Sequence, residues 1–298
     1  MRKNGHLKMI NIIVTSKPVD GLLHYSYEYC CALKAADIPA RVHIITRRDY
    51  APEDYMASLE NKYKDTIEDV YINDYYPSDD KEVNMVMGHS MVSIPYRDLH
   101  EYDEDRYFML HSLFRKKPII SVHSENDIEG YSLALEHFKI DITYCLCDKE
   151  VYPNGHGDHF EKTINFSLYK TPKDDIMFKY LFLGTNKEYY NELSDVVPNY
   201  ESHGILTMQG EDYLNPDWNN VSAPVQNLMG MFETYVYNKQ TFDPAPRIIM
   251  ECKYFNKEII YNRSADMIDG GSVYMNREPQ EPNLEEIVKA YNELQRVG

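Results

Sequence analysis

Two carboxylates with a defined spacing stand out in the segment Thr241–Asn262. Asp243 precedes a proline-rich turn, and Glu251 lies inside the helix expected after that turn, with seven residues between the two. A carboxylate can accept two hydrogen bonds from a vicinal diol. Arg247 and the free N–H groups at the start of the same helix suit phosphate oxygens. The alternative is that Asp243 is a turn or cap residue and that Glu251 pairs with Arg247 or Lys253.

The loop Lys17–Gly21, after the first expected strand, carries a second group of candidates. Ligands of parallel α/β sheets bind at the carboxyl ends of the strands, which is where this loop begins. Asp20 could act as a general base, and His24, on the helix that follows, competes with it for that role. The alternatives are that Asp20 caps the helix and that His24 packs in the core.

Two further histidines follow expected strands. His123 ends the apolar run Pro118–His123, and His89 comes directly after Asn84–Gly88. Both are therefore expected where the ligand-contacting residues of a parallel sheet gather. The alternative for each is an ordinary core or loop histidine.

The elements that must position these residues alternate along the first half of the chain. Short apolar runs suited to buried strands are separated by stretches of helical periodicity, which predicts a doubly wound parallel sheet with right-handed crossovers. The expected strands are Met9–Thr15, Ala40–Thr46, Asn84–Gly88, Pro118–His123 and Ile142–Cys147. The expected helices are Leu22–Asp37, Ala51–Lys64, Asp103–Phe114 and Tyr131–Phe138.

A second α/β domain is expected after the polar stretch Lys170–Asp175. Its expected strands are Phe178–Gly184, Gly204–Met208, Tyr235–Tyr237 and Glu258–Tyr261. Its expected helices are Asn186–Val196, Pro224–Phe232, Pro246–Phe255 and the closing helix Asn283–Val297. The sequence therefore predicts an α/β protein of two Rossmann-like domains, residues 1–170 and 171–298.

With these elements in place, the chain resembles glycosyltransferases of the GT-B fold. Many of them carry two acidic residues with the spacing of Asp243 and Glu251, the second on a helix that leads into a strand. Here an aspartate, Asp243, stands where the first residue is usually a glutamate. The resemblance implies that Glu251 binds the ribose of a nucleotide-sugar donor and that Asp243 lies near the sugar. It also implies parallel sheets that face a central cleft, and a last helix that crosses back onto the first domain.

The resemblance assigns further residues to the donor and the acceptor. Phe182–Lys187 looks like the strand and glycine turn that open the second GT-B domain, with Gly184 at the turn and Lys187 at the diphosphate. The alternative for Lys187 is an ordinary lysine in the first turn of a helix. The loop Lys17–Gly21, with His24 and His89, falls on the acceptor side. His123 matches a histidine that often contacts donor or acceptor.

The implied activity is transfer of a hexose or pentose from a nucleotide sugar, with a UDP-sugar as the expected donor and no metal or other cofactor required. Two acceptors stay open. One is a glycan or lipid-linked glycan, and the other is a hydroxymethylated base in DNA, because the chain looks similar to phage proteins that modify such bases. Two alternative functions are a non-catalytic two-domain α/β protein that binds sugars or nucleotides, and a nucleotide-sugar epimerase.

Net charge, apolar runs and cysteine content indicate which partners and which cell compartment to expect. The formal net charge of −17 disfavours nonspecific binding to nucleic acid, although a local basic site stays possible. No apolar run approaches the roughly 20 residues that cross a bilayer, and the polar start of the chain does not resemble a secretory signal. The cysteines are five, an odd number without metal or redox spacing: Cys30, Cys31, Cys145, Cys147 and Cys252. We therefore expect a cytoplasmic protein with reduced thiols and no membrane insertion.

Sequence motifs for other chemistries are absent. The chain has no P-loop, no dinucleotide-binding G-x-G-x-x-G and no G-x-S-x-G elbow. The D-x-D pattern within Tyr102–Asp105 begins an expected helix, where acidic residues favour the helix dipole rather than a metal. The sequence therefore predicts no metal site.

Overall fold

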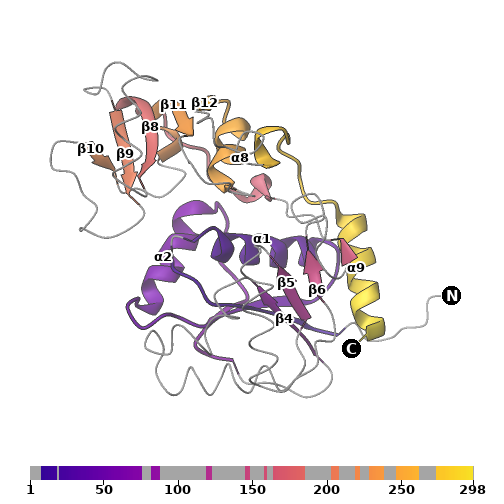
Figure 1. The fold of residues 1–298 in the computed structure, drawn as a ribbon. Coiled ribbons are helices and arrows are strands. Elements are labelled where there is room, and N and C mark those ends of the chain that lie inside the picture. The colour runs from indigo at the N-terminus through magenta and orange to yellow at the C-terminus, as the bar shows by residue number, and fades with distance from the viewer. Residues whose placement is uncertain are drawn as a thin grey trace, which may run out of the picture. The chain divides into compact units, whose positions relative to one another are not determined.

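The computed structural model describes residues 8–18, 20–75, 82–87, 119–122, 145–147, 158–159, 164–184, 203–207, 219–221, 228–237, 246–261 and 273–297 (Figure 1). The helices expected at Asp103–Phe114, Tyr131–Phe138 and Asn186–Val196 lie outside the described residues. Contacts between Cα atoms divide the chain into two compact units. The first comprises residues 1–60, 65–165 and 281–298, and the second comprises residues 61–64 and 166–280. The predicted domains, 1–170 and 171–298, stay a prediction about which parts fold independently.

The first unit is built on a parallel sheet whose seven described strands follow the order β3-β2-β1-β4-β5-β6-β7. Their bounds are β1 Ile10–Val14, β2 Ala40–Ile44, β3 Val70–Ile72, β4 Val83–Met87, β5 Ile119–Val122, β6 Cys145–Cys147 and β7 Asp158–His159. All five residues of β1 are buried, as expected for a central strand that is covered on both faces. The chain order reverses between β1 and β4, which are direct neighbours in register. This pair is therefore the topological switch point of the sheet.

Helix α1, Gly21–Ala35, packs on β1 and β2. It begins at Asp20, whose carboxylate accepts a hydrogen bond of 3.2 Å from the backbone N–H of Leu22. Helix α2 spans Pro52–Lys62, and helix α9 spans Leu284–Val297 and packs against α1 (Figure 1). The Tyr291 hydroxyl of α9 lies 3.3 Å from the Lys8 carbonyl oxygen, to which it donates. The C-terminal helix thus belongs to the first unit, beside the start of the chain.

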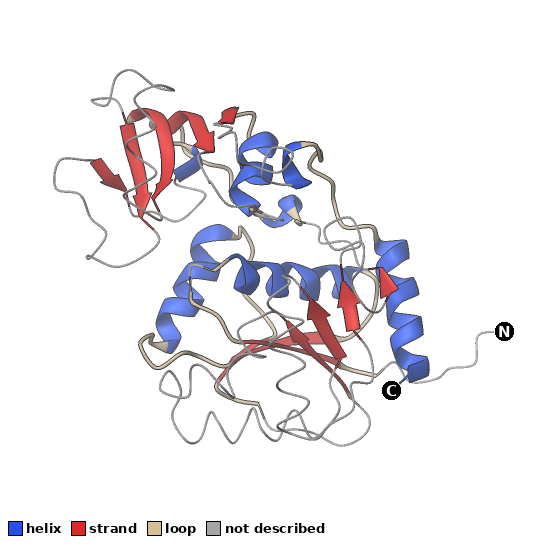
Figure 2. Ribbon diagram, viewed as in Figure 1, coloured by secondary structure: helices blue, strands red, loops and turns tan. Residues whose placement is uncertain are grey.

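The second unit holds another parallel sheet, whose five described strands follow the order β10-β9-β8-β11-β12 (Figure 2). Their bounds are β8 Phe178–Gly184, β9 His203–Thr207, β10 Asn219–Val221, β11 Phe232–Tyr237 and β12 Glu258–Tyr261. Helix α8, Arg247–Tyr254, is the crossover between β11 and β12, and 3₁₀ turns span Phe166–Leu168 and Val273–Met275. The order reverses between β8 and β11, which makes this pair the second switch point.

The predicted fold class, an α/β protein with two Rossmann-like parallel sheets, is confirmed by these strand orders. Strands β8 and β12 have the bounds that the sequence predicts. Three strands, β3, β7 and β10, are not predicted, because runs of two or three residues leave no periodicity. No helix among the described residues is long and apolar enough to cross a membrane.

Most other elements differ from the sequence predictions by one to three residues at their ends, and the largest differences lie in the second unit. The helix expected over Pro224–Phe232 gives way to a turn at Gly230, and β11 starts at Phe232 rather than at Tyr235. Glycine is needed at position 230 because a Cβ there would lie 1.7 Å from the backbone oxygen of Lys173. Pro246 is the N-cap residue of α8 and not part of its first turn.

A buried histidine lies on β2, next to the edge strand β3. The His43 side chain is buried, and its Nδ1 lies 3.0 Å from the Asp74 carbonyl oxygen, to which it donates. Tyr71 stacks on the ring, and Tyr75 meets it edge to face. Burial lowers the pKa of His43 to about 4, although the hydrogen bond to Asp74 opposes the shift. The imidazole is therefore neutral in the folded protein near neutral pH.

His43 should make the stability of the protein sensitive to mild acid. The folded pKa of about 4 lies below the ordinary value of 6.5, so the unfolded chain binds more protons between these values. The free energy of unfolding should fall as the pH drops through this window, by up to about 1.4 kcal/mol per pH unit from this residue. His43→Asn, which keeps a donor for Asp74, should flatten that slope in urea unfolding between pH 7 and pH 4.5. An unchanged slope would contradict the assignment.

Candidate functional site

The candidate residues follow the strands at the two switch points. Parallel α/β sheets bind ligands outside the carboxyl ends of their strands, where the strand order reverses. After β1, the first unit places Lys17, Asp20, Gly21 and His24. In the second unit, Gly184 is the last residue of β8, and Arg247 and Glu251 lie on the crossover that follows β11. The described candidates thus follow, along the chain, the strands of the two switch points, where ligand sites of parallel sheets most often lie.

Four predicted site residues lie outside the described part of the chain: His89, His123, Lys187 and Asp243. Their roles stay predictions. In sequence, His89 follows β4 and Lys187 follows β8, so each comes after a strand of a switch point.

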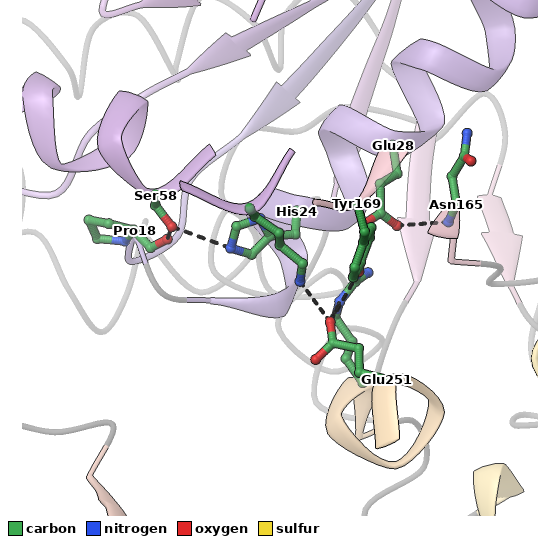
Figure 3. Close-up of polar contacts among 9 residues, drawn as sticks. Pro18, His24, Glu28, Ser58, Asn165, Tyr169 and Glu251 are labelled. Carbon is green, nitrogen blue, oxygen red and sulfur yellow. Dashed lines mark hydrogen bonds and ion pairs between the residues drawn. The ribbon is translucent and has the colours of Figure 1, made fainter. Parts of the chain in front are cut away.

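The loop after β1 is tied down by local contacts. Asp20 caps α1, the structural alternative that the sequence left open. His24 is buried, and its Nε2 lies 3.3 Å from the Ser58 hydroxyl on α2, which itself donates to the Pro18 carbonyl oxygen at 2.5 Å (Figure 3). Because the one Ser58 proton goes to Pro18, Ser58 accepts from His24. In this tautomer His24 carries a proton on Nε2.

The Glu251 carboxylate is the centre of a buried polar cluster in the second unit. Its Oε1 atom lies 2.7 Å from Lys62 Nζ and 3.0 Å from the Tyr169 hydroxyl (Figure 3). Arg247, one turn earlier on α8, brings its Nε to 3.7 Å from the same oxygen and donates from Nη2 to the Tyr169 hydroxyl at 2.5 Å. Relative exposure is 2% for the Glu251 side chain, 3% for Lys62 and 8% for Arg247, so the charges are withdrawn from water together.

These contacts keep Glu251 ionised. Burial alone would raise the pKa of the carboxyl, but the charges of Lys62 and Arg247 and the hydrogen bonds from Lys62 and Tyr169 hold the pKa below its ordinary value. The sequence alternative of a pair with Arg247 is therefore present in part, while Lys253 instead donates to the carbonyl oxygens of Met275 and Arg277.

The two oxygens of Glu251 are not equivalent. The hydrogen bonds that described residues donate to the carboxylate both go to Oε1, and Arg247 Nε lies 3.7 Å from the same oxygen. An ionised oxygen with free lone pairs in a buried setting can accept hydrogen bonds from a ligand hydroxyl.

Sequence reasoning did not find Lys62 and Tyr169. They are 189 and 82 residues away from Glu251 in the chain, and only tertiary structure joins them. An antiparallel bridge between Tyr63 and Tyr169 aligns the two segments, and Lys170 donates its backbone N–H to the Lys62 carbonyl oxygen. No motif spacing signals such a pair.

Aromatic rings hold α8 against the same segment. Phe166 stacks on Tyr254 of α8 with ring centroids 4.2 Å apart, and it also contacts Tyr169. The Lys62 ammonium lies 4.8 Å from the centre of the Tyr169 ring, a cation–π distance. The side chains that surround Glu251 are therefore packed against one another.

No group of residues suited to a metal ion occurs among the described residues. The sulfur atoms of Cys30, Cys31 and Cys252 form no disulfide, and burial raises the pKa of each thiol above its ordinary value. These thiols are therefore protonated at neutral pH and offer no nucleophile.

Comparison with known proteins gives structural matches only. No family model matches the sequence, and no curated protein matches it. The chain is similar to the crystal structure of Anabaena Alr3699/HepE in complex with UDP, at 13% identity over 97% of this chain and 90% of that chain, with a TM-score of 0.47.

Two other solved structures illustrate the range of matches. The glycotransferase of kitacinnamycin is similar at 10% identity over 97% of this chain and 91% of that chain, with a TM-score of 0.44. The UDP-GlcNAc 2-epimerase from Neisseria meningitidis bound to UDP-GlcNAc has 10% identity over 97% and 91% of the two chains, with a TM-score of 0.39. Glycosyltransferases, the class that the sequence resembles, are thus among the similar structures, and the fold class itself rests on the strand orders.

Loss of the Glu251 charge should destabilise the second unit strongly. Glu251→Gln leaves the Lys62 ammonium buried without its carboxylate, which typically costs about 3–5 kcal/mol. Since the folded pKa lies below the ordinary 4.5, the carboxylate stabilises the protein above about pH 4.5 and less as the pH falls through the folded value. Urea unfolding should therefore show a large deficit for the variant at pH 7 that narrows below about pH 4.5.

The matched control is Glu233→Gln, which changes an exposed glutamate of β11 in the same unit. Its free energy of unfolding should stay within about 0.5 kcal/mol of wild type. Equal stability of the two variants at pH 7 would show that the buried ion pair is not a major contribution.

Proposed function

We propose that this protein transfers a sugar from a nucleotide-sugar donor to an acceptor. The observation that supports this most is the state of the Glu251 carboxylate, which is buried and ionised and accepts hydrogen bonds from described residues at only one of its two oxygens. It lies on the crossover helix that follows a strand of the second switch point. A ribose presents a vicinal diol, and a charged acceptor that is already dehydrated and oriented binds such hydroxyls with little reorganisation.

The donor is proposed to lie in the second unit, with its ribose on Glu251 Oε2. Arg247 and Lys187 would stabilise the charge that develops on the leaving diphosphate, and Asp243 would lie near the sugar. Gly184 ends β8 without a side chain, which lets a phosphate approach the backbone there. A UDP-sugar is the donor that we propose, with no metal or other cofactor.

The acceptor is proposed to bind after the strands of the first unit, near Lys17, Gly21 and His89. Asp20 and His24 are the proposed general bases if the reaction inverts the sugar, and His123 is proposed to contact the reacting centre. Of the two acceptor classes, a glycan is favoured over a base in DNA, because a net charge of −17 repels a polyanion.

Thermal unfolding against a panel of nucleoside diphosphates and nucleotide sugars tests the proposal. A ligand that binds only the folded protein stabilises it by about 2.7 kcal/mol at a hundredfold excess over Kd. We expect a shift with a UDP compound, loss of the shift in Glu251→Ala, and its retention in Glu233→Gln. No shift with any compound, in protein shown to be folded, would overturn the proposal.

Turnover separates transfer from the alternatives. Incubation of the bound nucleotide sugar with acceptor candidates, including oligosaccharides and DNA that contains 5-hydroxymethylcytosine, should release the nucleoside diphosphate only when the right acceptor is present. Conversion of the nucleotide sugar to its epimer without any acceptor would identify an epimerase instead. Tight binding with neither product would identify a binding protein.

A further inference from the structure

Two hydrogen-bond donors converge on one oxygen of Glu251. Lys62 Nζ and the Tyr169 hydroxyl lie 2.7 Å and 3.0 Å from Oε1, and no described residue donates to Oε2. A carboxylate that makes one such contact can still turn about its terminal bond, which changes the direction in which its other oxygen accepts. Two donors on the same oxygen, from separate segments of the chain, disfavour that rotation.

The Tyr169 hydroxyl both donates and accepts a hydrogen bond within this cluster. Its hydroxyl has a single proton, and Arg247 Nη2 donates to the hydroxyl oxygen at 2.5 Å. The tyrosine therefore directs its own proton to Glu251 Oε1. Arg247 thus acts on the carboxylate twice, through this hydroxyl and through its own charge at 3.7 Å.

The donors themselves are held in place. Backbone bonds of Lys64 to Leu168, at 2.9 Å, and of Lys170 to Lys62, at 3.0 Å, align the two segments. The Tyr169 ring is packed against Tyr63 and Phe166, with the Lys62 ammonium over its face. Movement of either donor would have to break this packing.

We propose that Lys62 and Tyr169 are positioning residues that fix the Glu251 carboxylate, so that Oε2 selects nucleotides with ribose hydroxyls over nucleotides without them. This inference rests on the proposed function and extends it to sugar discrimination within the nucleotide. Oε2 has two lone pairs, which suffice for one or both hydroxyls of the ribose. Glu251 contacts the ligand, whereas Lys62 and Tyr169 act only through Glu251.

Calorimetric titration with UDP and with 2′,3′-dideoxy-UDP tests this directly, with the corresponding guanosine pair if the panel selects GDP. A hydrogen bond to a charged group corresponds to roughly ten- to a hundredfold in affinity, so wild type should prefer UDP by about that factor. In Lys62→Met the preference should fall to within about threefold of unity, because the freed carboxylate rotates and no longer presents Oε2 in one direction. Lys62→Arg, which keeps a charged donor, should restore most of the preference.

Two further variants guard against a trivial effect on folding. Tyr169→Phe removes only the hydroxyl and should reduce the preference by a smaller factor in a protein that still unfolds cooperatively. Lys64→Met changes an exposed lysine two residues from Lys62 and keeps its backbone bond to Leu168, so it should leave the preference unchanged. If Lys62→Met does not fold, Tyr169→Phe decides.

The outcomes separate this inference from the proposed function. A wild-type preference for UDP that persists in folded Lys62→Met and Tyr169→Phe, with only a lower Tm, would give these residues a purely structural role and overturn the inference alone. Binding of UDP by wild type without any preference over the dideoxy compound would also overturn it. Absence of nucleotide binding in wild type would remove the proposed function and the inference with it.

Discussion

The buried ion pair between Lys62 and Glu251 is the interaction on which the rest of the site depends. Removing a carboxylate from water is costly, and an ammonium at 2.7 Å offsets that cost only when further donors satisfy the remaining lone pairs. Tyr169 donates a hydrogen bond to Oε1, and Arg247 places its charge near the same oxygen and donates to the Tyr169 hydroxyl. What the described residues leave unsatisfied is Oε2, and an unsatisfied charged atom in a packed cluster is where a ligand gains most from binding.

Two side chains of helix α2, one turn apart, contact different candidate residues. Ser58 and Lys62 are four residues apart and therefore lie on the same face of the helix. Ser58 contacts Pro18 and His24 of the first unit, and Lys62 contacts Glu251 of the second.

Much of the fold could be predicted because the parallel strands are short, mainly apolar runs between breaker residues. Phe178–Gly184 and Glu258–Tyr261 are such runs, each with one charged residue, and their bounds were predicted without error. The short strand Val70–Ile72 could not be found, because it is an edge strand defined by its pairing with β2 rather than by its own pattern. The close approach of the Lys173 backbone to Gly230 could not be found either, because it too arises only in the tertiary structure.

The candidate site could be predicted only in part. The position of Glu251 on a helix between two strands was visible in the sequence, and so was the alternative that Asp20 caps α1, which the structure shows. The partners of Glu251 were not, because nothing local selects Lys62 from the other lysines or Tyr169 from the 27 tyrosines. Burial distinguishes Lys62 in the structure: it is 2% exposed, whereas Lys64, two residues later, is exposed.

The most direct measurement is a crystal structure of the protein with bound UDP. The account predicts a ribose hydroxyl within hydrogen-bond distance of Glu251 Oε2, while Lys62 and Tyr169 stay on Oε1. A nucleotide bound elsewhere, or a ribose that displaces Lys62 from the carboxylate, would contradict it.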